Sequence, residues 1–290
     1  RKWERRLKEI REGGKRRLGI NPVRLSGKPL ISVVTVVLNG GQTLERCIKS
    51  VISQTYPSIE YIVVDGGSKD GTMDIIKQYD KAIDYWVSEK DNGLYHAMNK
   101  AVLFCTGDYI LYLNADDELY NSQTMEKVAN NVTKDIDIFY GNILVEDKYC
   151  EEYIQLGREF SLNDIKKEKK PPHPAFFVRS SLLKENPFNE KCRIASDYDL
   201  MCRLFRKHLK MKYINEIISI FHAGGLSSLF FRTNRENAVI IRENFGTKYA
   251  IFYLMRKSLG LLYHFFLVFL SHLRIRGIIR RLKHKHKGKK

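Results

Sequence analysis

The amino-acid sequence predicts an α/β fold in which a largely parallel sheet is covered by helices on both faces. Continuous runs of β-branched and other apolar residues, typical of strands buried on both faces, alternate with segments whose apolar residues recur at helical spacing. Glycine-rich or acidic turns directly follow the three strongest runs. Ligands bind beyond the carboxyl ends of strands in such sheets, so the same pattern indicates where a site would lie.

The predicted elements follow one another in strand–helix order. The strands are expected at residues 31–38, 60–65, 84–89 and 108–114. The helices are expected to begin near residues 43, 72 and 94, and the last of these ends before Gly107. This β-α-β-α alternation is typical of a doubly wound sheet.

Basic residues are concentrated at the two ends of the chain. The net charge of the 290 residues is +17, of which residues 1–28 contribute +8 and residues 248–290 contribute +12, so that residues 29–247 carry −3. A nucleic-acid-binding domain usually carries its positive charge on a folded face, so this distribution argues against nucleic acid as a partner. Basic tails that also contain apolar residues favour an anionic membrane surface.

The charge pattern divides the chain into three parts. Residues 1–18 are expected to form a basic helix with Trp3, Leu7 and Ile10 on one face, followed by a linker that ends near residue 28. Residues 29–247 form the predicted catalytic domain. The odd number of cysteines, five, and the absence of a CxxC pair favour a reducing compartment. No secretory signal is visible, and we therefore expect a cytoplasmic protein.

Residues 248–290 are expected to form an amphipathic, basic tail associated with the inner face of the cell membrane. The segment SLGLLYHFFLVFLSHL contains no Asp, Glu, Lys or Arg, and the basic segment IRGIIRRLKHKHKGKK follows it. A spanning helix needs about 20 apolar residues, so this run is short. A helix lying in the membrane interface fits it better. A helix packed on the catalytic domain and a true span are the alternatives.

The turn VDGGSKDGT (64–72) is a candidate ligand-binding loop. Its glycines allow a sharp turn and a close backbone approach to a ligand, and Asp65 at the strand end could accept hydrogen bonds from a base or ribose. An ordinary glycine-rich turn with Thr72 as a helix cap explains the same residues.

The sequence NADD (114–117) is a candidate metal site. Two adjacent carboxylates at the end of a buried strand repel each other, and their desolvation costs free energy that a divalent cation would offset. Oxygen ligands suit Mg²⁺ or Mn²⁺. A turn followed by a helix cap is the alternative.

Residues 31–228 resemble glycosyltransferase family 2, which has the GT-A fold, and are most similar to bacterial members that build O-antigen, capsule and exopolysaccharide. The resemblance rests on the order and spacing of several segments. They are SVVTVVLNGGQTLERCIKSVISQTYPSIEYIVVDGGSKDGT, SEKDNGLYHAMNKA, GDYILYLNADD, HPAFFVR, SDYDL and FHAGGLSS. It implies a mixed sheet flanked by helices, to which the helical basic extension expected from the C-terminal charge pattern is added.

The resemblance also implies the residues of the donor site. Thr35, Asn39 and Asp65 would line the nucleoside pocket, with Ser68 nearby. The donor-side loop would contain Asp91 and Gly93.

The metal and catalytic residues follow from the same resemblance. Asp116 and Asp117 would form the metal site that holds the donor diphosphate, and His222 would lie near them. Asp197, in SDYDL, occupies the position of the catalytic base, with Asp199 as the alternative. His173 fits either a substrate-side role or a structural one.

The implied reaction is the inverting transfer of a sugar from a nucleoside-diphosphate donor, with a preference for uridine. The acceptor would be a hydroxyl of a saccharide that is lipid-linked, in bacterial surface-polysaccharide synthesis. A non-catalytic nucleotide- or glycan-binding module with a decayed site is the rival interpretation. A dinucleotide oxidoreductase is disfavoured because NGG, rather than GxGxxG, follows the first strand.

Overall fold

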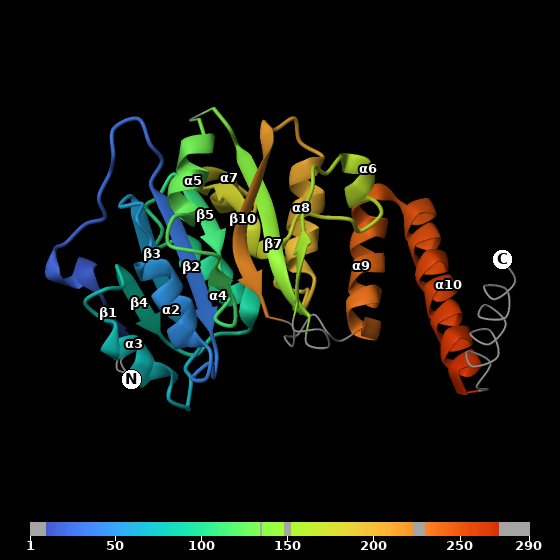
Figure 1. The fold of residues 1–290 in the computed structure, drawn as a ribbon, viewed down its shortest axis with the longest axis horizontal. Helices are drawn as coiled ribbons and strands as arrows, with labels where there is room; N and C mark the ends of the chain where they lie inside the picture. Colours follow the sequence, from blue (N-terminus) through green and yellow to red (C-terminus); the bar gives the residue numbers. More distant parts are fainter. Residues whose placement is uncertain (1–9, 134, 148–151, 223–229, 273–290) are drawn as a thin grey trace, which may run out of the picture.

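A computed structural model describes residues 10–133, 135–147, 152–222 and 230–272. One ten-stranded mixed sheet runs through the molecule, and helices cover both of its faces (Figure 1). The strands lie in the order β1-β4-β3-β2-β5-β9-β7-β10-β6, and β8 pairs with β7. This arrangement confirms the fold class predicted from the sequence.

The strands and helices have the following bounds. The strands are β1 (Arg11–Gly13), β2 (Ile31–Val37), β3 (Ile59–Asp65), β4 (Tyr85–Ser88), β5 (Tyr109–Tyr112), β6 (Glu118–Leu119), β7 (Ile138–Asp147), β8 (Glu152–Leu156), β9 (Phe176–Arg179) and β10 (Met211–Phe221). The helices are α2 (Leu44–Ile52), α3 (Thr72–Gln78), α4 (Leu94–Val102), α5 (Thr124–Asn131), α6 (Leu162–Ile165), α7 (Ser180–Glu185), α8 (Ser196–Phe205), α9 (Phe230–Phe245) and α10 (Thr247–His272). Two short 3-10 helices, η1 (Lys15–Leu18) and η2 (His173–Ala175), complete the set.

The four strands predicted from apolar runs form one parallel block. β2 pairs in parallel with both β3 and β5, and β3 pairs in parallel with β4. Every residue of β2 is buried, as expected for a strand covered on both faces. β9 joins this block to β7 by antiparallel pairing on both of its sides, which makes the sheet mixed.

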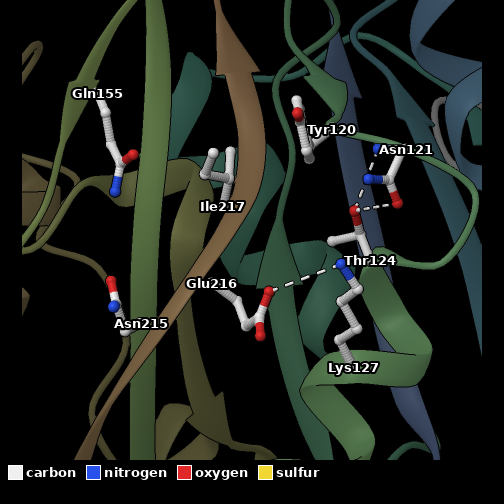
Figure 2. A pocket seen from close by; sticks show the side chains of 8 residues that line it. All are labelled: Tyr120, Asn121, Thr124, Lys127, Gln155, Asn215, Glu216 and Ile217. Atoms are coloured by element: carbon white, nitrogen blue, oxygen red, sulfur yellow. Dashed lines mark hydrogen bonds and ion pairs between the residues drawn. The ribbon is translucent and has the colours of Figure 1, made fainter.

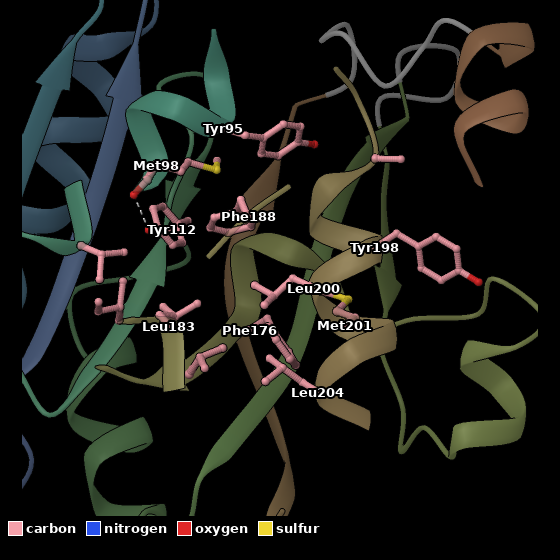
Figure 3. Close-up of a cluster of buried hydrophobic side chains, with 14 of the residues drawn as sticks. Tyr95, Met98, Tyr112, Phe176, Leu183, Phe188, Tyr198, Leu200, Met201 and Leu204 are labelled. Atoms are coloured by element: carbon pink, nitrogen blue, oxygen red, sulfur yellow. Dashed lines mark hydrogen bonds between the residues drawn. The ribbon is translucent and has the colours of Figure 1, made fainter. Parts of the chain in front are cut away.

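Each face of the sheet has its own hydrophobic core. On one face, Val33 and Val37 of β2 pack with residues of α2, α3 and α5. On the other face, Val34 and Val36 belong to a cluster that includes residues of α4, α7, α8, α9 and α10. Figure 3 shows the part of this second cluster where Tyr112 of β5 approaches Phe188 and α8. Side chains of β2 therefore point alternately to the two faces of the sheet, and helices pack against both sets.

The prediction of one basic helix over residues 1–18 is wrong for residues 11–18, which form a short strand and a 3-10 helix instead. Residues 11–13 form β1, which pairs with the edge of β4, and η1 follows. The reason lies in Gly13 and Gly14, which weaken a helix. A side chain at Gly14 would collide with the backbone of Asp84, and its φ of 99° is one that glycine readily adopts. Trp3 and Leu7 of the predicted apolar face lie outside the described part of the chain, whereas Ile10 is partly buried against the core cluster that contains Val34.

The C-terminal segment contains two consecutive helices. α9 and α10 meet at Gly246, whose φ of 96° permits the sharp turn between them. Tyr253 of α10 is buried, and its hydroxyl donates a hydrogen bond of 2.7 Å to Asn234 of α9. In Figure 1, α10 runs beside α9 at the end of the molecule farthest from β1. Within the described residues, none of the helices combines the length and the apolar character that crossing a membrane requires.

Candidate active site

Four loops gather at one edge of the sheet because the strands that precede them are parallel. They are residues 38–43, 66–71, 89–93 and 113–117, which follow β2, β3, β4 and β5. This edge is the lower one in Figure 1. Loops at the carboxyl ends of parallel strands are where such sheets bind ligands. The candidate donor residues at positions 39, 65, 68, 91, 93, 116 and 117 all lie on or directly beside these loops.

The first two loops are joined by hydrogen bonds. The backbone N–H of Asn39 donates to Oγ of Ser68 at 2.7 Å, and Oδ1 of Asn39 accepts from the N–H of Lys69 at 2.9 Å. Asn39 has a φ of 54°, in the left-handed region that asparagine tolerates better than most residues. The structure therefore brings Asn39 and Ser68 together.

Asp65 supports the loop that follows it. Its buried carboxylate accepts hydrogen bonds from the N–H groups of Gly67 and Ser68, each at 3.1 Å, and from Oγ of Ser88 at 2.7 Å. Both carboxylate oxygens thus have partners inside the protein, because Oδ1 also binds the Ser68 hydroxyl. In this arrangement, Asp65 holds the 66–71 loop rather than presenting a free carboxylate.

Thr35 lies apart from the other candidate donor residues. Its side chain is fully buried, and its hydroxyl lies 3.1 Å from the hydroxyl of Tyr61 and 3.4 Å from Sγ of Cys47 on α2. Side chains alternate between the two faces along a strand, and this position points beneath α2. The structure therefore leaves Thr35 out of the group at the sheet edge.

The Asp91–Gly93 loop lies against the loop after β3. Oδ1 of Asp91 accepts a hydrogen bond of 2.9 Å from the N–H of Gly93. The other oxygen of Asp91 occupies the space that a Cβ atom on Gly66 would need. The Asp91 side chain thus packs directly against Gly66, which brings the loop after β4 next to the loop after β3.

The carboxyl group of Asp117 is buried at the end of β5. It accepts hydrogen bonds from the Asn114 amide at 3.2 Å and from the backbone N–H of His222 at 3.3 Å. Burial and, to a smaller degree, the neighbouring Asp116 carboxylate raise its pKa to about 8. β6 follows the turn directly, so the alternative explanation of NADD as a helix cap does not apply.

Asp116 lies nearer the surface and is fixed through its backbone. Its carbonyl oxygen accepts a hydrogen bond of 2.8 Å from Arg46 of α2. The Arg46 guanidinium also lies 3.7 Å from Glu118. Arg46 was not identified from the sequence, and it connects the predicted metal motif to the helix after the first loop.

The ring of His222 is engaged away from the aspartate pair. Its Nδ1 lies 2.7 Å from Glu146 and its Nε2 lies 3.1 Å from Glu118. Only its backbone faces Asp117, so the expected role of this ring as a metal ligand is not apparent in this arrangement. Within the described residues, no three His, Cys, Asp or Glu side chains are grouped so that they could hold a metal ion.

Asp197 lies in the first turn of α8 and pairs with Lys170. Nζ of Lys170 is 2.7 Å from Oδ2 of Asp197, whose side chain is 17% exposed. Burial acts to raise the pKa of Asp197, but Lys170 and His173 outweigh it and hold this pKa below its usual value. Asp197 is therefore ionised at neutral pH and retains a route to solvent.

Two contacts place Asp197 close to the donor-side loops. The hydroxyl of Tyr95, in the first turn of α4, donates to the carbonyl of Ile194 at 2.6 Å. The ring of His173, which interacts electrostatically with Asp197, stacks on Tyr112 of β5 with centroids 5.9 Å apart. The start of α8 is thus tied both to the helix after the Asp91 loop and to the strand that leads to NADD.

Asp199, the alternative base, is occupied by structural contacts. Its carboxylate is buried and pairs with Nε of Arg203, one turn along α8, at 2.9 Å. The other oxygen accepts from Asn244 of α9 at 3.3 Å. These contacts favour Asp197 over Asp199 as the residue available to a substrate.

A separate pocket of about 280 Å³ lies away from this edge (Figure 2). It is formed where β10, β8 and the start of α5 meet. None of the predicted site residues lines it; the lining residues are Tyr120, Asn121, Thr124, Lys127, Gln155, Asn215, Glu216 and Ile217.

The GT-A-like fold and the acidic group at the carboxyl edge of its parallel strands define a nucleotide-sugar transferase. Sequence comparison agrees, because residues 32–212 match the model of the family described as glycosyl transferase family 2. The chain belongs to this family and is a glycosyltransferase.

Several relatives share this assignment. A PGL/p-HBAD biosynthesis glycosyltransferase of Mycobacterium bovis is 30% identical over 208 residues, which are 69% of this chain and 80% of the relative. An uncharacterized glycosyltransferase of Methanocaldococcus jannaschii is 32% identical over 213 residues, covering 66% of this chain and 70% of the relative.

Solved structures show the same fold at lower sequence identity. Residues 1–349 of Staphylococcus aureus TarS in complex with UDP-GlcNAc match with a TM-score of 0.60 at 18% identity, over 74% of this chain and 67% of that one. The mannosyltransferase PcManGT of Pyrobaculum calidifontis, in complex with GDP-Man and Mn²⁺, matches with a TM-score of 0.59 at 15% identity, over 88% of this chain and 85% of that one.

Proposed function

We propose that this glycosyltransferase moves a sugar, with inversion, from a nucleoside-diphosphate donor to a hydroxyl of a saccharide acceptor. The observation that carries the proposal is the contrast between two acidic positions, one at the carboxyl edge of the parallel strands and one at the start of α8. Asp117 is buried beside Asp116 and has a raised pKa, whereas Asp197 is ionised and partly exposed. The first arrangement suits cation-assisted diphosphate binding, and the second suits a general base.

Asp116 and Asp117 are the proposed ligands of Mn²⁺ or Mg²⁺. The pKa of Asp117 is raised because its ionised carboxylate would be buried beside Asp116 without a positive partner strong enough to stabilise it. A divalent cation would provide that positive charge. Hard oxygen ligands fit either ion. When bound, the cation would stabilise the negative charge that develops on the departing diphosphate. PcManGT offers a precedent within the fold, since its structure contains Mn²⁺ together with GDP-Man.

Asp197 is the proposed base. The carboxylate takes the proton of the acceptor hydroxyl as its oxygen attacks the anomeric carbon from the face opposite the leaving group. A new carbon–oxygen bond forms, the bond from the anomeric carbon to the diphosphate oxygen breaks, and its electron pair leaves with the diphosphate. The configuration at the anomeric carbon is inverted, and no covalent enzyme intermediate is required.

A uridine nucleotide is the proposed donor component. TarS in complex with UDP-GlcNAc supports this preference, whereas PcManGT in complex with GDP-Man shows that the fold also accommodates guanosine. Asn39, Ser68 and Asp91 of this chain are the residues proposed to contact the nucleotide, and Asp65 holds the 66–71 loop, which carries Ser68, in place.

A lipid-linked acceptor and attachment to an anionic membrane surface complete the proposal. α10 carries exposed apolar side chains, and its exposed Leu259, Leu262 and Tyr263 each have more than 60% of their surface accessible. Residues 248–290 contain twelve Lys or Arg and no acid. An apolar helix face together with basic residues suits an anionic lipid surface. Enzyme and acceptor would then share one surface on the inner face of the cell membrane.

Titration of the protein with UDP, GDP and their sugar conjugates tests the donor assignment. We expect UDP to bind more tightly than GDP in the presence of Mn²⁺, and one UDP-sugar to be hydrolysed slowly without acceptor. Preference for GDP would overturn the uridine assignment alone. Tight nucleotide binding with no turnover of any donor, even with lipid-linked saccharides added, would support the rival binding module.

A further inference from the structure

The start of α8 has no cap from its own side chains. Ala195 occupies the N-cap position and offers no side-chain hydrogen bond. Backbone N–H groups at the entrance to a helix need partners, and alanine is among the poorest N-cap residues. Asp197 lies two residues beyond this uncapped position. The position of the proposed base therefore depends on groups from other elements.

A carboxylate from α9 holds the residues that lead into α8, rather than the N–H groups of its first turn. Oε2 of Glu236 accepts hydrogen bonds from the N–H groups of Ile194 at 2.9 Å and of Ala195 at 3.1 Å. The N–H of Arg193 also donates to this carboxylate, at 3.1 Å. Successive backbone N–H groups that converge on one anion form a nest, and hydrogen bonds to a carboxylate are stronger than those to a neutral acceptor.

The same short segment is held on its other side by α4. The carbonyl of Ile194 accepts a hydrogen bond of 2.6 Å from the buried Tyr95 hydroxyl. Figure 3 shows the Tyr95 ring reaching from α4 towards the segment that leads into α8. The residue before the N-cap is thus fixed through both its N–H and its carbonyl group.

We propose that Glu236 is a positioning residue for Asp197. The inference rests on the proposed role of Asp197 as the base. Glu236 touches neither the donor loops nor the carboxylate of Asp197 in any contact recorded for the described residues, and it acts on the backbone that carries this carboxylate. A general base must lie within hydrogen-bond reach of the proton it removes. A displacement of about 1 Å can lower a rate by about 100-fold.

Glu236 should affect turnover more than donor binding. The donor-side loops are held by their own hydrogen bonds, such as those from Asn39 to Ser68 and from Gly67 to Asp65. None of these bonds involves α8 or α9. Loss of the Glu236 carboxylate should therefore shift Asp197 while leaving the nucleotide pocket in place.

The test compares Glu236→Gln and Glu236→Ala with Glu243→Gln, an exposed acid on the same helix. The assay is hydrolysis of whichever of UDP-glucose, UDP-GlcNAc and GDP-mannose the wild-type enzyme turns over. We expect both Glu236 variants to lower kcat by about 10- to 100-fold, with the donor dissociation constant changed less than about twofold. Glu243→Gln should behave as the wild type.

Two further measurements separate positioning from a general loss of fold. Hydrogen exchange of the amides at 193–195 should quicken in Glu236→Gln, while exchange in β2 and β3 stays unchanged. Glu236→Asp, which retains a carboxylate, should recover more turnover than Glu236→Gln at equal thermal stability.

The inference is overturned if both Glu236 variants keep wild-type kcat, or if donor affinity falls in proportion to kcat. Asp197→Asn is measured in parallel. Its full activity would show that the base assignment itself is wrong, whereas an inactive Asp197→Asn beside fully active Glu236 variants would reject the positioning role alone.

Discussion

At the scale of single residues, the two aspartates of SDYDL should have separable effects. Asp197→Asn should lower turnover by about 10² to 10⁴, the usual contribution of a general base, with little change in stability. Asp199→Asn should keep most activity and lower the free energy of unfolding by about 1 to 3 kcal/mol, because it weakens a buried pair with Arg203. Measuring turnover and denaturant unfolding of both variants shows which aspartate acts in catalysis and which in stability. An inactive Asp199→Asn beside an active Asp197→Asn would reverse the assignment.

His173 should make stability depend on pH. Burial lowers its pKa below the usual 6.5, outweighing the opposing effect of Asp197. The unfolded chain therefore binds the proton more readily, so this contribution to stability is complete above about pH 6.5 and declines as the pH falls below it.

The matched variants are His173→Phe, which keeps a ring against Tyr112, and His208→Gln at an exposed position. Between pH 7 and 5, His173→Phe should lose less stability than the wild type in denaturant unfolding, and His208→Gln should follow the wild type. If all three proteins lost the same stability between pH 7 and 5, His173 would not be the cause of the pH dependence.

Sequence patterns located the loops that follow the parallel strands, but not the contacts that other elements make around α8. Asn39, Ser68 and Asp91, which the family resemblance named as donor-site residues, lie on neighbouring loops because each follows a parallel strand, and their contact with a donor stays a prediction. Lys170 and Glu236 were missed because neither follows a strand of the parallel block, and their contacts with Asp197 and Ala195 form only when α8 packs against other elements.

At the scale of elements, the segment from β1 to η1 should contribute to folding. Arg16 of η1 forms an ion pair with the fully buried Glu60 of β3. Removing one member of a buried pair leaves an unpaired charge and costs about 3 to 5 kcal/mol. Arg16→Met should therefore lower the free energy of unfolding by about 3 kcal/mol.

The control is Arg17→Met, whose partner Glu12 is exposed, so the expected loss is below about 1 kcal/mol. Adding Glu60→Gln to Arg16→Met should restore part of the stability. If Arg16→Met and Arg17→Met lower the free energy of unfolding equally in urea titrations, the buried ion pair of Arg16 does not stabilise the fold more than an exposed one.

Strands with a continuous apolar pattern were predictable from the sequence, whereas strands that depend on pairing with a neighbouring strand were not. β2 to β5 appear within two residues of their predicted bounds because burial on both faces demands continuous apolar runs. β1 has only three residues and is defined by its pairing with the edge of β4. Its own sequence does not indicate a strand. β7 and β10 were likewise not assigned from the sequence.

At the scale of the whole molecule, the C-terminal helix should govern membrane attachment. Deleting residues 258–290 keeps Tyr253 and the 2.7 Å contact of Lys257 with Glu168. It removes the most exposed apolar residues that the structure describes in α10, which are Leu259, Leu262 and Tyr263, and nine of the twelve Lys and Arg residues of 248–290. The full chain should sediment with vesicles of phosphatidylcholine and phosphatidylglycerol and be partly released by high salt, since each basic residue contributes about 1 kcal/mol.

The truncated protein should stay in the supernatant and keep its nucleotide affinity. Sedimentation of both forms to the same extent would place the attachment elsewhere. Failure of the full chain to sediment in any salt would reject attachment, and release by detergent alone would indicate insertion deeper than the interface.

The most direct test of the central claim is sugar release from a nucleotide-sugar with and without a divalent cation. The enzymes compared are the wild type, Asp116→Asn, Asp117→Asn and the control Asp74→Asn at an exposed position of α3. We predict that Mn²⁺ or Mg²⁺ supports release by the wild type and by Asp74→Asn, that EDTA abolishes it, and that both NADD variants lose most activity while unfolding at the wild-type temperature. Release that persists in EDTA, together with active Asp116→Asn and Asp117→Asn, would contradict the assignment of this edge as the catalytic site.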